Sequence, residues 1–291
     1  MTPDSILLPE DLRLISQGHP GSGTHLMLTA IAESIAEAGL ASAPPIDVGF
    51  DLDGGEAMRM VAAGRSGALG SCSPAYLTTP IVHGLEVTWR DLTPVAQLVT
   101  DSYLLVAPVG SVATAAELFA GPTTVAVPKL GGNTDIQGML LGEATGTEVT
   151  VALEHDPAEL RALLADGRAH WTTGVYSDFA DDLAAGRLRV VATFDAEPAP
   201  SADAQTLRES GIDVVFPLWR GVIGPGDLPE AVVRAWGEAL PLIVEQGAWQ
   251  RYIAEQRQRD AYLPPAEFAE LLADEDDRYR GWVRALERRD S

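Results

Sequence analysis

The feature that most constrains the fold of this chain is a strand, glycine-rich loop and helix unit that occurs twice. Residues 12–15 are short, apolar and typical of a strand, and a glycine-rich loop at 18–24 and a helical pattern over 26–38 follow them. The second half repeats this order, with a strand pattern at 123–127 and a glycine-rich loop at 128–134 before another helix. Strands that alternate with helices predict an α/β protein with largely parallel sheets.

The C-terminal part of the chain predicts mainly helices. A short strand is expected at 214–218, and helices are expected from Glu230 towards 244, over 249–258 and from about 265 to near 288. The 291 residues are many for one compact domain but an ordinary number for two lobes.

The charge of the chain limits what it can bind. A formal net charge of −22 repels nucleic acid and anionic lipid, so neither is expected as a partner. The same charge repels an anionic ligand at long range. Any site for an anion must therefore be a local positive spot, and the chain has a single lysine, Lys129, among its cationic residues.

The cysteine count and the apolar patterns of the chain limit which covalent links, metal sites and membrane segments can be expected. The single cysteine, Cys72, rules out an intramolecular disulfide and a cysteine-based zinc site. The start has neither a basic segment nor a long apolar run, and no stretch is apolar enough to span a bilayer. We expect no membrane insertion, and a cytoplasmic location for the sequence as written, or a periplasmic or extracellular one if a signal precedes it. No metal is expected, because His155-Asp156 supplies too few ligands and the sequence shows no third. No cofactor is expected either, because the G-x-G of the first loop lacks the full dinucleotide fingerprint.

Several segments, in order along the chain, resemble one family. They are Pro20-Gly-Ser-Gly-Thr24, Trp89-Arg-Asp-Leu-Thr-Pro-Val-Ala-Gln97, the loop at 129–138, Ala184-Ala-Gly-Arg-Leu-Arg-Val-Val-Ala-Thr193 and Trp219-Arg-Gly-Val-Ile-Gly-Pro225. Together they resemble the solute-binding receptors of tripartite tricarboxylate transporters, the TctC and Bug-like proteins. The chain departs from that pattern at His25, where the family usually has Asp, and at Ala152-Leu-Glu-His-Asp-Pro157, where it has Val-Pro-Tyr-Lys-Gly.

The resemblance implies a type II periplasmic-binding-protein fold, in which two lobes close by a hinge around a small carboxylate in a central cleft. Lobe 1 would comprise residues 1–103 and 222–291, and lobe 2 residues 104–221. Membrane transporter subunits would be the partners. A small anionic ligand also fits the two glycine-rich loops, because a helix N-terminus carries unpaired N–H groups and a partial positive charge.

The expected ligand-binding residues come from these two loops and from strand ends that face the cleft in the family. Arg220 is a further possible carboxylate partner. The set is His19, Gly21, Ser22, Gly23, Thr24, Ser71, Ser73, Lys129, Gly132, Asn133, Thr134, Thr173 and Trp219. Tight turns, solvated loop residues and a core tryptophan are the alternative interpretations of these positions.

Two other functions stay open from the sequence. The same scaffold could serve as a cytoplasmic enzyme, with His25, Cys72 or His155 as the candidate catalytic residues, joined by His19 for acid–base chemistry. It could also serve as a cytoplasmic ligand sensor. Cys72 as a buried apolar residue and Asp156 as a helix cap are the structural alternatives.

Overall fold

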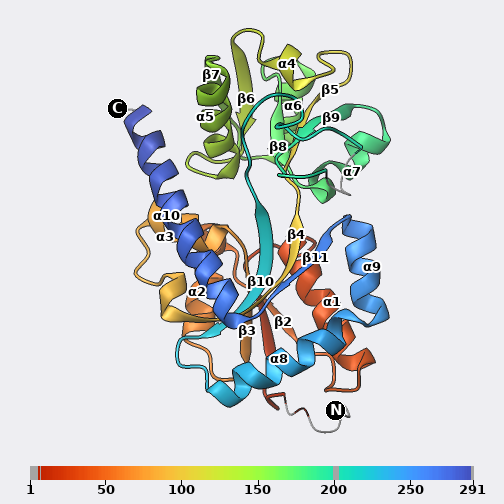
Figure 1. Cartoon of the computed structure of the whole chain (residues 1–291), viewed down its shortest axis with the longest axis vertical. Coiled ribbons are helices and arrows are strands. Elements are labelled where there is room, and N and C mark those ends of the chain that lie inside the picture. The colour runs from red at the N-terminus through yellow and green to blue at the C-terminus, as the bar shows by residue number, and fades with distance from the viewer. Residues whose placement is uncertain (1–5, 7, 199–202, 290–291) are drawn as a thin grey trace. The chain divides into compact units, whose positions relative to one another are not determined.

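The computed structural model describes residues 6, 8–198 and 203–289, and the chain divides into two compact units (Figure 1). Unit 1 comprises Met1–Thr100 and Trp219–Gly281, and unit 2 comprises Asp101–Leu218 and Trp282–Ser291. The largest difference from the predicted lobes is at the C-terminus, which we had placed wholly in lobe 1. Trp282 stacks on Phe216 with ring centroids 4.9 Å apart, and this contact draws the end of the last helix into unit 2.

Unit 1 is built on a six-stranded sheet in the order β11-β4-β10-β3-β1-β2 (Figure 1). Strand β1 pairs in parallel with β2 and β3, whereas β10 runs antiparallel to β3 and β11 antiparallel to β4. The strands are β1 (Arg13–Ser16), β2 (Ile46–Val48), β3 (Ala68–Cys72), β4 (Leu92–Asp101), β10 (Leu218–Pro225) and β11 (Arg259–Leu263).

Helices cover this sheet and bury its apolar side chains. Leu14 of β1 and Met27, Leu28 and Ile31 of the first helix are fully buried in one core, together with Trp236. The helices are α1 (Gly23–Glu37), α2 (Asp51–Ala62), α3 (Ala75–His83), the 3₁₀ helix η2 (Trp89–Asp91), α8 (Glu230–Val244), α9 (Gly247–Gln256) and α10 (Pro265–Arg289).

Unit 2 has a three-stranded antiparallel sheet in which β5 (Leu104–Pro108) pairs with β8 (Thr172–Gly174) and β9 (Leu188–Thr193). Strands β6 (Thr123–Val127) and β7 (Val149–Leu153) are parallel, and a parallel bridge between Val125 and Trp171 connects them to the segment before β8. The helices of this unit are α4 (Ala115–Leu118), α5 (Asn133–Thr145), α6 (Pro157–Ala165) and α7 (Tyr176–Ala184). Leu104, Val106, Ala126 and Leu163 share its core.

Three sequence expectations were wrong or incomplete. The sheets are not largely parallel: the six-stranded sheet is mixed and the β8-β5-β9 sheet is antiparallel, because β5, β10 and β11 each run against a neighbour. The segment expected to be a strand at 214–218 is irregular, and β10 begins only at Leu218. The side chain of Phe216 is buried, as in a strand, but its N–H donates to Phe194 O in a hydrogen bond that belongs to no pair of strands. Helix α3 was missed because it carries two threonines and Pro80, which are weak helix formers.

Among the described residues, no helix combines the length and the apolar character needed to cross a membrane.

Candidate functional site

The first glycine-rich loop of unit 1 leads directly from β1 into α1. Gly21 has φ +83°, a left-handed conformation that glycine adopts without strain, and Ser22 caps the helix by accepting the N–H of His25 at 3.4 Å. The hydroxyls of Ser22 and Thr24 lie 3.4 Å apart at this helix end. The loop therefore brings together two hydroxyl groups and the free N–H groups of the first helical turn.

Arg220 of β10 places a positive charge at the same helix end. Its side chain is buried, with 5% of the residue exposed, and it packs so closely on Gly23 that a Cβ there would lie 2.5 Å from Nη2. Only glycine leaves room for this approach. The guanidinium and the helix N-terminus are both positive, so an anion placed between them would gain from each. An anion site in so acidic a chain would need a local positive group, and Arg220 at this helix end is such a group.

Polar side chains at the end of β3 accept hydrogen bonds from the residue directly before this loop. The Gln17 N–H donates to Ser71 Oγ at 3.1 Å, and the Gln17 side-chain amide donates to Ser73 Oγ. The remaining amide oxygen, Gln17 Oε1, is buried without a hydrogen-bond partner among the described residues. Gln17 was not among the predicted residues, although its place directly before the loop is a signal the sequence contained.

The candidate catalytic residues lie in different local environments. Cys72 is fully buried, and burial raises the pKa of its thiol, so the neutral and weakly nucleophilic form is favoured. His25 accepts the Gly21 N–H at 3.4 Å, and His19 is exposed with its ring edge against Phe50. His155 lies in unit 2, where its ring contacts Pro128 O at 2.8 Å.

The second glycine-rich loop, in unit 2, is built like the first. Gly131 has φ +71° and lies two residues before α5, as Gly21 does before α1. Gly132 takes the N-cap position without a side-chain cap, and the N–H of Gly131 donates instead to Asp135 at 2.9 Å. Lys129 is half-buried beside Gly132, and its backbone oxygen accepts the Gly132 N–H.

A buried polar network supports this loop. The Thr173 hydroxyl donates to Gln137 Oε1 and lies 3.0 Å from Thr134 Oγ1, while the Asn133 amide donates to Tyr103 at 2.6 Å. Gln137 is fully buried, and its Nε2 has no hydrogen-bond partner among the described residues. The network brings Thr134 and Thr173, 39 residues apart, together within unit 2.

Trp219 is part of the unit 1 core. It is 1% exposed and packs edge-on against Phe268 of α10 at 5.6 Å. Burial raises the pKa of the neighbouring Glu275, although Arg278 and the Trp219 indole partly offset that effect. This packing supports the interpretation of Trp219 as a core residue.

The structure collects the predicted residues into two sets. His19, the first-loop residues, Ser71, Ser73 and Trp219 lie in unit 1, and Lys129, the second-loop residues and Thr173 lie in unit 2. In the part of the chain that is described, no three His, Cys, Asp or Glu side chains are arranged to hold a metal ion.

Comparisons with known proteins identify the fold. No family model matches the chain, and no curated protein matches its sequence. A TctC solute-binding protein from Polaromonas is 19% identical with a TM-score of 0.78, covering 94% of this chain and 98% of that one. A protein of R. palustris with adipate is 20% identical with a TM-score of 0.80, covering 94% and 96%.

MatC of Rhodopseudomonas palustris, with bound malate, is 18% identical with a TM-score of 0.71, covering 94% of this chain and 98% of MatC. At these identities the likeness establishes the fold. The predicted α/β periplasmic-binding fold is therefore confirmed, and the chain is similar in structure to TctC and Bug proteins.

Proposed function

We propose that this chain is a solute-binding protein of the tripartite tricarboxylate transporter type, and that it binds a small carboxylate at the first glycine-rich loop. The observation that carries the proposal is the buried guanidinium of Arg220 against Gly23 at the N-terminus of α1. A fold shared with adipate-bound and malate-bound proteins supports the same class of ligand.

The chemistry of the loop suits a carboxylate. Arg220 offers a planar pair of N–H donors that match the two oxygens, and the first turn of α1 and Ser22 and Thr24 add neutral donors. Each charge-assisted hydrogen bond of this kind is worth about 1.5–3 kcal/mol. A few such contacts outweigh the long-range repulsion from the acidic surface, which salt in solution screens.

The second glycine-rich loop is a separate candidate carboxylate site within unit 2. It offers helix N–H groups, Asn133 and Thr134, with Lys129 beside them. Variants in each loop show which of the two loops binds the acid.

Isothermal titration with adipate, malate, a tricarboxylate and an amino acid tests the proposal. We expect one of these acids to bind, and Gly23→Ala to weaken that binding at least tenfold because the new methyl group displaces the guanidinium. Gly237→Ala in α8 is the matched control, since a Cβ there meets no atom within 4 Å.

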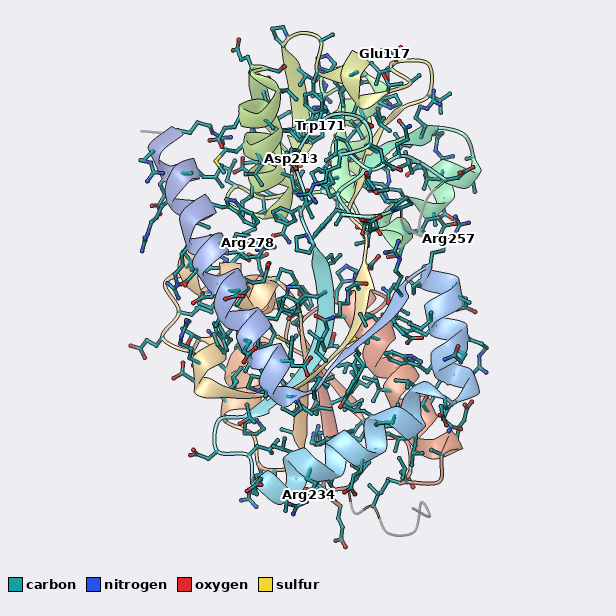
Figure 2. All side chains as sticks on the ribbon, in the orientation of Figure 1. Glu117, Trp171, Asp213, Arg234, Arg257 and Arg278 are labelled. Carbon is teal, nitrogen blue, oxygen red and sulfur yellow. The ribbon has the colours of Figure 1, made fainter. Side chains whose placement is uncertain are left out.

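Arg220→Gln tests the charge directly. Its control is Arg234→Gln, which removes the same charge from an exposed position on α8 (Figure 2). We expect the first variant to lose affinity and the second to keep it. Equal affinity in both, or no heat and no thermal shift with any acid, would rule out the carboxylate site.

Delivery of the ligand to membrane transporter subunits, outside the cytoplasm, is part of the same proposal. A cell that lacks this protein should take up the bound acid more slowly, and Gly23→Ala should not restore uptake. Normal uptake in its absence would separate ligand binding from transport and favour a sensing role.

A further inference from the structure

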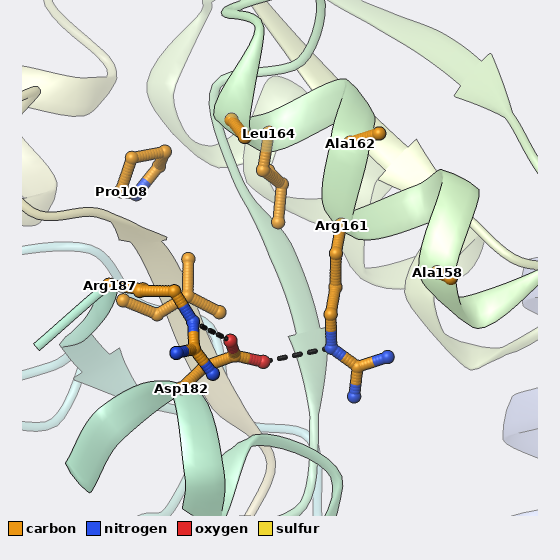
Figure 3. A pocket seen from close by; sticks show the side chains of 9 residues that line it. Pro108, Ala158, Arg161, Ala162, Leu164, Asp182 and Arg187 are labelled. Carbon is orange, nitrogen blue, oxygen red and sulfur yellow. Dashed lines mark hydrogen bonds and ion pairs between the residues drawn. The ribbon is translucent and has the colours of Figure 1, made fainter. Parts of the chain in front are cut away.

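Unit 2 contains a pocket that the proposed function does not use. Its volume is about 400 Å³, within the range of small-molecule sites. It is lined by α6, by Asp182 of α7, by the start of β9 and by the end of β5 (Figure 3). None of the lining residues belongs to either glycine-rich loop.

Most of the pocket wall is apolar. Ala158, Ala162 and Ala165 lie on α6 at helical spacing, and Leu188 and Pro108 close the other side. The small alanine side chains leave the space that larger residues would fill. Next to the wall, Val109 is 54% exposed, and its N–H donates to Arg187 O at 3.0 Å. The apolar surface thus continues past the rim.

Two arginines meet one carboxylate beside this wall. Arg161 Nε donates to Asp182 at 2.8 Å and Arg187 Nε donates to the other oxygen at 2.6 Å (Figure 3). Burial opposes ionisation of Asp182, but the hydrogen bonds from Arg187 and Arg161 outweigh it and hold its pKa below the ordinary value. The carboxylate is therefore charged, and the three groups together keep one positive charge.

The terminal nitrogens of the two arginines differ in whether they already have hydrogen-bond partners. Arg161 is tied by Nη1 to Pro157 O and by Nη2 to Asp178 O. Arg187 contacts Asp181 O through Nη2 at 3.4 Å, and its Nη1 has no hydrogen-bond partner among the described residues. Arg187, which lines the pocket, thus combines an orientation fixed by Asp182 with a donor that has no partner among the described residues.

We infer that this pocket is a second ligand site, and that it takes a small aliphatic monocarboxylate. Its carboxylate would accept from Arg187 Nη1, and its hydrocarbon tail would cover the alanine and leucine wall. Net positive charge favours an anion, and the apolar wall favours a tail over a second carboxylate. The inference does not depend on the site proposed at the first loop.

Hexanoate is the probe, followed by nuclear magnetic resonance of the backbone amides. We expect shifts that saturate at residues 158–165 and 187–188, and weaker shifts with hexanamide, which has the same tail without the charge. Arg187→Gln should weaken hexanoate binding about tenfold, as expected for the loss of one charge-assisted hydrogen bond. Ala162→Leu should also weaken it by filling the pocket.

Arg168→Gln is the matched control, because this exposed arginine pairs only weakly with Asp166 at 3.5 Å and does not line the pocket. It should bind hexanoate as the unchanged protein does. Unperturbed amides elsewhere show that a variant is folded. Absence of shifts in this region, equal affinity for hexanoate and hexanamide, or an Arg187→Gln affinity equal to that of the control would overturn the inference. Gly23→Ala should leave these shifts unchanged, so failure here and failure at the first loop are separate results.

Discussion

Arg289, in the last turn of α10, lies 3.0 Å from Asp135 in the first turn of α5, and Asp135 in turn accepts the N–H of Gly131 at 2.9 Å. Asp135 is 1% exposed. The end of the chain therefore neutralises a buried carboxylate and, through it, holds the second glycine-rich loop in its conformation.

Replacing this arginine should destabilise unit 2. In Arg289→Ala, buried Asp135 loses its ion pair, so we expect the free energy of unfolding to fall by about 2 kcal/mol. Urea denaturation followed by tryptophan fluorescence, to which buried Trp171 of this unit contributes (Figure 2), measures the change. Arg284→Ala, at an exposed position on the same helix, should change it by less than about 0.5 kcal/mol. Equal effects would show that the pair does not stabilise the unit.

Asp182 should make stability fall in acid. Its folded pKa is lowered by Arg187 and Arg161 against the effect of burial, so the ionised form stabilises the folded state. That contribution is complete above the unfolded pKa of about 4 and is lost as the pH falls through the lower, folded value. Asp182→Asn should therefore lose less stability between pH 6 and pH 3 than the unchanged protein does. Parallel pH profiles of urea midpoints would contradict this expectation.

Glu275 should have the opposite effect. Burial raises its pKa more than Arg278 and Trp219 lower it, so ionisation costs stability in the folded state. The cost is absent below the unfolded pKa and grows as the pH rises through the unfolded value towards the raised, folded one. We expect Glu275→Gln to be about 1 kcal/mol more stable at pH 7 and no more stable at pH 4. Thermal unfolding at both pH values checks the sign, and lower stability at pH 7 would mean that the pair with Arg278 dominates.

Cys72 should be unreactive in the folded protein. It is fully buried with a raised pKa, so a thiol reagent should label it only after the chain unfolds in guanidinium. Labelling rates with and without denaturant test this, and the unfolded sample serves as the positive control. Rapid labelling of the folded protein that also abolishes its activity would restore the enzymatic hypothesis.

Local patterns predicted most of the elements. Strand β6, helix α6 with its Asp156 cap and the two glycine-rich loops lie where the sequence placed them, because capping and hydrophobic period depend on near neighbours. Strand β11, which the sequence patterns did not predict, and the start of β10, which they placed too early, are decided instead by the strand that pairs with each. Strand β11 is only partly buried, so its alternation is weak without its partner β4.

The candidate sites needed the tertiary structure. From sequence, Gly23 and Thr134 were visible as loop and helix-entry residues, and Arg220 was a possible carboxylate partner without a known neighbour. Its burial against Gly23 comes from the position of β10 in the unit 1 sheet. Arg289 and Asp135 are 154 residues apart, and Arg161 and Asp182 are 21 apart on different helices. The sequence by itself determined the α/β class, the loops and the need for a local positive spot. Only packing between distant segments decided which charges are buried together, because such pairs leave no periodic or local signal in the chain.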